Sequence, residues 1–513
     1  MEIGRVRESR GDIVTFVTVN NVNVGYGQVV KFVDSEGRSL KTYYARIVDA
    51  GSRSTLRDVD ELRDLTGQVR TVGPYTQYRY IDSVLFLEKD ASGTIRAPTL
   101  NPDYGWKVEI LNEDDYDALN ISGGKLKLGY LRVGDSTFKK IVGIDVGSIP
   151  RMMAIVGQIG SGKTNAELVL NSSIMLTNGE AVGLIFDFAG ELLTGKGIGK
   201  GLADFPNVEE KLVYFSVEKP RRKVFYQPIH IGLRKLSPSD LEHLFPDLTF
   251  PQKHYAEKLY RKIGSPDWIL KVVSKYFDED VEGVRKLVPG QKSVVEALLR
   301  KLSSLNEKVF IDLEYDFRPM VIEALINGKT VLVDISGLRE ETQKQIVTWV
   351  TASVINYYRE LWRKNFEAWK RLPYLLITLE EAHKFLAEKD TIFSDIALTY
   401  RKYNVGLNAV TPRPSGINRD VFAELWTKII LKTTLKEDRV YLVENTPYLE
   451  YSGTELKMLD IGEALLISQP AIHFAVPIKI FDYKEFLEEY VEKSFKPKEK
   501  HEIKLSSIDE NVI

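Results

Sequence analysis

The stretch Val156–Asn165, "VGQIGSGKTN", decides the fold of this chain. Its Gly157-x4-Gly162-Lys163-Thr164 spacing is the phosphate-loop pattern. An apolar run, "RMMAIVG" (151–157), precedes it, and a helical pattern, "NAELVLNSSIMLTN" (165–178), follows. In a strand–loop–helix unit of this kind, backbone N–H groups and the positive end of the helix point at bound phosphates. The stretch therefore predicts a nucleotide-binding α/β domain.

The loop also predicts which atoms meet the nucleotide. We expect Lys163 to reach the β- and γ-phosphates of ATP, and the Thr164 hydroxyl to bind Mg²⁺. The residues expected to contact the nucleotide are Gly157, Gln158, Ile159, Gly160, Ser161, Gly162, Lys163, Thr164 and Asn165.

Composition limits the remaining function classes. With 513 residues, the chain is long enough for several domains, and 43% apolar and 28% charged residues describe a globular protein. The absence of cysteine excludes disulfides and cysteine-based metal sites. No apolar run is long enough to span a membrane and no leader opens the sequence, so we expect a cytoplasmic protein without membrane contact. Because the net charge is −2, any nucleic-acid contact must come from local basic loops.

The order of short and long apolar runs divides the chain. Short runs separated by turn residues predict a small β-barrel or sandwich at 1–112. Buried strands alternating with helices predict an α/β core with a mostly parallel sheet at 141–234 and 311–485. The other predicted parts are a linker at 113–140, a helical insertion at 235–310 and a polar tail at 486–513.

A second motif, "LLITLEEAHKF" (375–385), ends an apolar strand in Glu380 and Glu381. Carboxylates at the carboxyl end of a buried strand lie where ligands bind in open α/β sheets. We expect Glu380 to hold Mg²⁺ through water and Glu381 to polarise the attacking water, with His383 as a weaker candidate. The alternative is that both acids only begin the next helix.

Other charged residues are candidates by position. Asp187, in "LIFDFAGEL" (184–192), ends another predicted strand together with nearby Glu191, and either neighbours the metal or caps the next element. Arg401, Arg413 and Arg151 are candidates for compensating the charge of the transferred phosphoryl group, in part from a neighbouring subunit. The alternative for each arginine is a surface or packing role.

These motifs together resemble the HerA–FtsK superfamily of P-loop motors, and specifically its archaeal HerA type. The similar segments are "GQIGSGKTN" (157–165), "LIFDFAGEL" (184–192), "GKTVLVDISGL" (328–338), "ITLEEAHKFL" (377–386), "YRKYNVGLNAVTPRP" (400–414), "TKIILK" (427–432) and "IGEALLI" (461–467). The resemblance implies a HAS-barrel-like N-terminal domain, a RecA-like ATPase core and a homohexameric ring. It also implies duplex DNA in a central pore and a NurA-type nuclease partner acting in DNA-end processing. Arg151 and Arg401 match positions at or near the arginines that act in trans in this family.

Two positions depart from the family pattern. Pro412 stands where the family has a glutamine that senses γ-phosphate, and Leu398 replaces an arginine. We expect hydrolysis to survive, because the loop and both acids remain.

For DNA, the candidates are Lys196 and Lys200 in "ELLTGKGIGKGLA" (191–203), a loop expected to lie beyond the phosphate and metal groups. A merely solvated loop is the alternative. Two other functions compete: a ring ATPase that remodels or loads a protein, and a monomeric nucleotide switch or small-molecule kinase.

Overall fold

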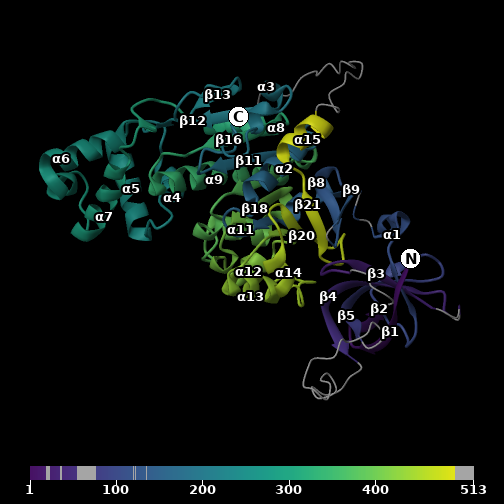
Figure 1. Ribbon diagram of the computed structural model, residues 1–513. Helices are drawn as coiled ribbons and strands as arrows, with labels where there is room; N and C mark the ends of the chain where they lie inside the picture. The colour runs from purple at the N-terminus through teal and green to yellow at the C-terminus, as the bar shows by residue number, and fades with distance from the viewer. Residues whose placement is uncertain are drawn as a thin grey trace, which may run out of the picture.

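The computed structural model describes residues 1–18, 24–34, 37, 39–54, 77–119, 121, 123–134 and 136–491. A small barrel lies at one end, a large sheet covered by helices forms the body, and a helical arm projects from the opposite end (Figure 1). Within the described residues, no helix is both long and apolar enough to cross a membrane.

The N-terminal domain is a closed barrel of six antiparallel strands. These are β1 (Glu2–Arg10), β2 (Ile13–Thr18), β3 (Val29–Val33), β4 (Thr42–Ser54), β5 (Gln77–Lys89) and β7 (Lys107–Ile110). They follow the order β2-β1-β7-β3-β4-β5, and a pairing between β2 and β5 closes the ring; β6 (Ile95–Arg96) extends β5. Closure removes exposed strand edges and encloses an apolar core that includes Phe16, Phe32 and Trp106.

The body is built on one twelve-stranded sheet. Eight of its strands run parallel, in the order β13 (Phe225–Pro228), β12 (Leu212–Ser216), β16 (Thr330–Asp334), β11 (Ala181–Asp187), β17 (Tyr374–Leu379), β18 (Val405–Thr411), β10 (Met153–Val156) and β19 (Thr427–Leu431). Four antiparallel strands continue it: β20 (Glu463–Ser468), β21 (Val476–Ile480), β8 (Leu126–Val133) and β9 (Ser136–Ile144).

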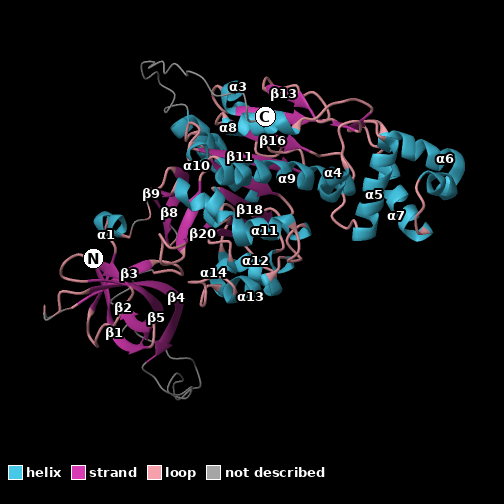
Figure 2. Ribbon diagram, turned by 180° about the vertical axis from the view of Figure 1, so that it is seen from behind, coloured by secondary structure: helices cyan, strands magenta, loops and turns pink. Residues whose placement is uncertain are grey.

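Helices cover both faces of this sheet (Figure 2). Alternate residues of β10 point to opposite sides: Met153 and Ile155 join one core, whereas Ala154 and Val156 join the other. The first face packs α2 (Lys163–Met175) and α15 (Tyr483–Phe486), and the second packs α9 (Glu340–Lys364) and α11 (Ile392–Thr399). The predicted fold class, a barrel followed by a P-loop domain with a mostly parallel sheet, is confirmed.

Apart from the helices of residues 238–304, which are described below, the other helices and strands are short. They are α1 (Glu113–Ala118), α3 (Val208–Lys211), α8 (Arg318–Ile326), α10 (Phe366–Trp369), α12 (Arg419–Ala423), α13 (Lys436–Glu444), α14 (Gly453–Met458), and a separate pair of strands, β14 (Ile231–Gly232) and β15 (Phe310–Ile311).

Residues 113–140, expected as a linker, instead contain α1, the whole of β8 and the start of β9. β8 alternates buried and half-buried side chains and pairs with β21, so it belongs to the body. Gly129 lies within β8, and its position requires glycine because a Cβ there would come within 2.1 Å of the Lys479 carbonyl oxygen. Of the tail expected at 486–513, residues 492–513 lie outside the described part of the chain.

Residues 238–304 form the projecting arm. Its helices are α4 (Pro238–Leu244), α5 (Phe250–Ile263), α6 (Trp268–Leu287) and α7 (Lys292–Ser304). The arm follows the strand-poor part of the sequence, where apolar residues recur at helical spacing.

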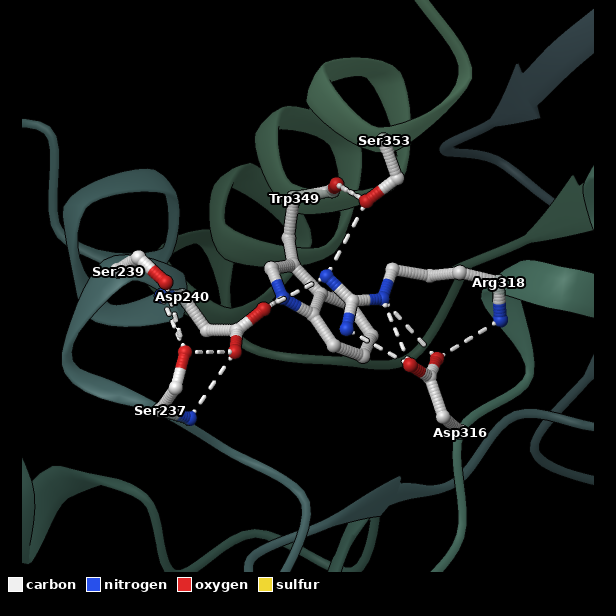
Figure 3. Close-up of polar contacts among 7 residues, drawn as sticks. All are labelled: Ser237, Ser239, Asp240, Asp316, Arg318, Trp349 and Ser353. Carbon is white, nitrogen blue, oxygen red and sulfur yellow. Dashed lines mark hydrogen bonds and ion pairs between the residues drawn. The ribbon is translucent and has the colours of Figure 1, made fainter. Parts of the chain in front are cut away.

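A partly buried ionic cluster fastens the base of the arm to the body (Figure 3). The Arg318 guanidinium lies 3.8 Å from the Trp349 ring centroid and donates hydrogen bonds to Asp240 of α4 and to Asp316. Trp349 Nε1 also donates to Asp240, at 3.0 Å. Burial alone would raise the pKa of Asp240, but the Arg318 charge and the Ser237 contacts outweigh it and hold that pKa below its usual value.

We predict that Arg318→Met will loosen the arm. The substitution leaves two partly buried carboxylates without their cation, which we expect to destabilise the fold by up to about 3 kcal/mol, the cost seen when a fully buried pair is broken. Chemical denaturation and limited proteolysis should therefore show a less stable protein that is cut within the arm. As a control, Arg300→Met removes an exposed arginine with one i,i+4 partner and should change little. Equal effects of the two substitutions would contradict the anchoring role.

Candidate nucleotide site

A cavity of about 1050 Å³ opens at the carboxyl ends of β10, β17 and β18. Because these strands run parallel, the segments that follow them meet at one edge of the sheet. The wall of the cavity includes Gly162, Lys163, Thr164, Glu380 and Glu381, together with residues of the C-terminal strands. The structure thus brings together the loop and the acid pair that the sequence singles out separately.

The phosphate loop depends on its glycines. Gly157 has φ +156°, and a Cβ there would lie 2.7 Å from Ser161 Oγ and 2.8 Å from Leu431 Cβ. Gly162 has φ +103° and caps the N-terminus of α2. Two backbone hydrogen bonds brace the loop: Gln158 N donates to Lys432 O (2.9 Å), and Gly462 N donates to Ser161 O (3.0 Å).

Lys163 reaches back over the loop. Its Nζ donates to the carbonyl oxygens of Gly157 (2.8 Å) and Gln158 (2.9 Å). Burial lowers the pKa of Lys163, and the nearby Glu167, Glu381 and Glu380 carboxyl groups partly offset that shift. An ammonium held over a glycine-rich cradle fits a nucleotide phosphate chain.

Two side chains of the loop segment form hydrogen bonds to the C-terminal part of the chain, and one of them, Asn165, also lines the cavity. Asn165 Nδ2 donates to Phe481 O at 2.7 Å, and its Oδ1 accepts from Tyr483 N at 3.0 Å. Gln158 Oε1 accepts from the backbone N and the Oγ1 of Thr434. These contacts tie the loop and α2 to the C-terminal elements.

Glu380 and Glu381 differ sharply in environment. Glu380 Oε2 accepts from Phe188 N at 2.8 Å, and burial, reinforced by Asp187, raises the pKa of Glu380 to about 8. Glu381 has left-handed backbone angles (φ 50°, ψ 36°), a strained conformation for a residue other than glycine. Its side chain is 43% exposed and lies 3.6 Å from His383 Nδ1, which is 3.0 Å from Thr411 Oγ1.

The Asp187 side chain caps the turn that follows it in the chain. Oδ1 accepts from the N–H groups of residues 189, 190 and 191, and Oδ2 accepts from Leu192 N. Burial raises the pKa of Asp187 to about 6, against the lowering effect of these N–H groups. Asp187 is fully buried and does not line the cavity, whereas Glu191 does. The capping alternative therefore describes Asp187 better than the metal role.

Comparisons with known proteins agree with this geometry. Residues 126–354 match the family model of the helicase HerA central domain. The DNA double-strand break repair helicase HerA of Sulfurisphaera tokodaii is 24% identical over 482 residues, which cover 89% of this chain and 90% of that protein. The protein of the same name from Pyrococcus furiosus is 24% identical over 517 residues, covering 91% of this chain and 89% of its own.

This chain is a P-loop ATPase whose residues 126–354 match the HerA central domain, and most of its length is similar to HerA helicases. Among solved structures, the bacterial conjugative coupling protein TrwB covers 66% of the chain and 87% of its own length, with 13% identity and a TM-score of 0.48.

In this ATPase, Arg151 and Arg401 do not line the cavity that holds the phosphate loop. They precede β10 and β18, whereas the phosphate loop follows β10. With Leu398 and Trp426 they line a separate groove of about 190 Å³, and the Arg401 guanidinium lies 5.2 Å from the Trp426 ring centroid. Arg413 instead follows β18, on the cavity side. It lies near enough to His383 for its charge to add to the effect of burial, which lowers the pKa of His383.

Of the two lysines proposed for DNA, Lys196 does not lie where the sequence predicts. Lys196 lines the nucleotide cavity and so is not beyond the phosphate and metal groups. Lys200 pairs with Glu488 at 3.1 Å. The loop folds back because its glycines permit tight turns. One such turn is closed by the hydrogen bond from Gly195 N to Glu191 O. Pro412 also lines the cavity, so an apolar ring stands where the family pattern has an amide.

Two cavity residues escaped sequence reasoning. Glu167, buried in α2, has a pKa raised well above its ordinary value, first by burial and then by the charge of Glu380. Lys479 of β21 lines the cavity and donates to Ile461 O at 2.7 Å. The signal for Glu167 was present, since it is the only acidic residue in an otherwise neutral helical run after Lys163.

The raised pKa of Glu380 predicts that this residue makes the folded protein less stable as pH rises. The folded protein keeps a proton that the unfolded chain releases above pH ~4.5, so Glu380 costs stability progressively as pH rises from about 4.5 to about 8. Glu380→Gln should therefore raise Tm by roughly 2–5 °C at pH 8–9 and change it little near pH 4.5. Thermal scans of nucleotide-free protein across this range measure the difference. A pH-independent Tm difference would contradict the assignment.

Proposed function

We propose that this ATPase works as a homohexameric ring that translocates along double-stranded DNA in break processing, beside a NurA-type nuclease. The single observation that carries the proposal is the cavity that unites Lys163 and Thr164 with Glu380 and Glu381. The printed names of relatives that match about nine-tenths of the chain support DNA repair as the setting.

In the proposed mechanism, the phosphate chain replaces the two carbonyl oxygens that Lys163 now contacts. Thr164 would hold Mg²⁺ and Glu380 would hold it through water; when bound, Mg²⁺ offsets the charge of the phosphate oxygens. Glu381, being exposed to the cavity and fixed by its backbone, would orient and polarise the attacking water. His383 lies 3.6 Å away and would position the Glu381 carboxylate.

Substitutions should separate binding from hydrolysis. Lys163→Ala removes the loop cation and should abolish detectable ATP binding. Glu381→Gln keeps the shape of the site, so ATP affinity should stay within about 3-fold while turnover falls roughly 100-fold or more. Titration with a fluorescent ATP analogue and a phosphate-release assay measure the two quantities. Parental turnover in Glu381→Gln would transfer the water-activating role to another acid.

In a ring, Arg151 and Arg401 would lie near the nucleotide site of a neighbouring subunit. Since Arg151 and Arg401 lie at the starts of their strands, away from the cavity, either would act only on the nucleotide of a neighbouring subunit. Arg413 lies nearer to its own cavity and would act in cis. A molar mass showing a stable monomer under ATPase conditions would leave Arg151 and Arg401 without such a role.

The DNA part of the proposal needs its own test. ATPase rates should rise at least several-fold with linear duplex DNA, and DNA binding should weaken steeply with salt while depending little on sequence. The sample should be of measured molar mass, and single-stranded DNA serves as the comparison. No binding or stimulation at low salt would reject translocation.

That negative result would favour the second candidate, a ring ATPase that remodels or loads a protein. Its specific support is Pro412 in the cavity wall and Leu398 in the arginine groove, where the family pattern has glutamine and arginine. Lys200, in turn, is paired with Glu488.

A further inference from the structure

Glu167 lies on the nucleotide side of α2. It follows Lys163 by four residues and Thr164 by three, so it occupies the helix surface one turn below both. It lines the same cavity as these two residues and Glu380. The helix therefore presents a lysine, a hydroxyl and a carboxyl group to one place.

One oxygen of the Glu167 carboxyl group has no hydrogen-bond partner among the described residues. The residue is 1% exposed, and its Oε1 accepts no hydrogen bond from any described residue. A buried carboxyl oxygen left unpaired costs about 1–3 kcal/mol, which an apolar side chain would avoid. Attraction to the helix dipole does not compensate, because that effect fades beyond the first turn.

Acidic groups outnumber basic ones around Glu167. Among its main electrostatic influences, Glu380, Asp187 and Glu191 are acidic and only Lys163 is basic. Mg²⁺ binds oxygen ligands and keeps several of its waters, so a cavity with surplus carboxyl oxygens and an adjacent hydroxyl fits such an ion.

We propose that Glu167 is a positioning residue for the metal of this ATPase, accepting hydrogen bonds from water bound to the metal without touching phosphate. The inference rests on the proposed Mg²⁺–ATP site. It assigns the unpaired Glu167 oxygen to metal-bound water, while Thr164 contacts the ion and Lys163 grips phosphate. Outer ligands of this kind typically change metal affinity 10- to 100-fold.

The test measures metal affinity separately from catalysis. Mn²⁺, followed by electron paramagnetic resonance, is titrated into the full-length protein with bound ATP, and ATP binding is measured in parallel in EDTA. Glu167→Gln keeps the side-chain size and removes a buried acid, so it should fold and melt no lower than the parent. We expect its Mn²⁺ affinity to fall 10- to 100-fold, with ATP affinity in EDTA within about 2-fold of parental.

Glu191→Gln is the matched control, because Glu191 lines the same cavity but does not lie on α2. Its Mn²⁺ affinity should stay within about 3-fold of parental. Equal losses in both variants would show a general charge effect and overturn the positioning role, as would unchanged affinity in Glu167→Gln. If the parental protein binds ATP without any metal dependence, the proposed Mg²⁺ site itself fails, together with this inference.

Discussion

The position of β18 between β10 and β17 is the constraint on which the site depends. Neighbouring strands lie about 4.8 Å apart, so the phosphate loop and the acid pair begin about 10 Å apart. The parallel register fixes their height as well, since Val156 lies beside Thr411 and Leu379 beside Ala409. That separation leaves room for phosphate, metal and water between Lys163 and Glu381. The spacing and register of these three strands therefore set the positions from which Lys163 and Glu381 reach the cavity.

The buried acids around the cavity are compensated to different degrees. Asp187 accepts four backbone N–H groups and stabilises its own turn. Glu380 accepts one, from Phe188, and borders the cavity. Glu167 has an oxygen with none. Burial without compensation is costly, so the acids with unused acceptor capacity are the ones left for a ligand, whereas the fully bonded one is structural.

Sequence reasoning succeeded where local chemistry determines structure and failed where distant contacts do. The glycine requirement of Gly157 and Gly162 made the phosphate loop recognisable, and the apolar strand before Glu380 placed the acid pair. The linker predicted at 113–140 was wrong because β8 joins the body through its pairing with β21, more than 300 residues away in the chain. Likewise, the direction of Lys196 depends on how its loop folds back, which residue spacing does not encode. The assigned roles of the site residues remain predictions.

A largely buried charge cluster joins the barrel to the ATPase domain near the phosphate loop. Glu455 of α14 pairs with Arg46 of the barrel and with Arg132 of β8, and Arg132 lies 3.9 Å from Glu463. Gly462, next to Glu463, donates the hydrogen bond that braces Ser161. A single carboxylate between two buried guanidinium groups resists separation, because removing it would leave both cations unpaired. α14 therefore links the barrel to the segment after it, in which Gly462 braces the phosphate loop.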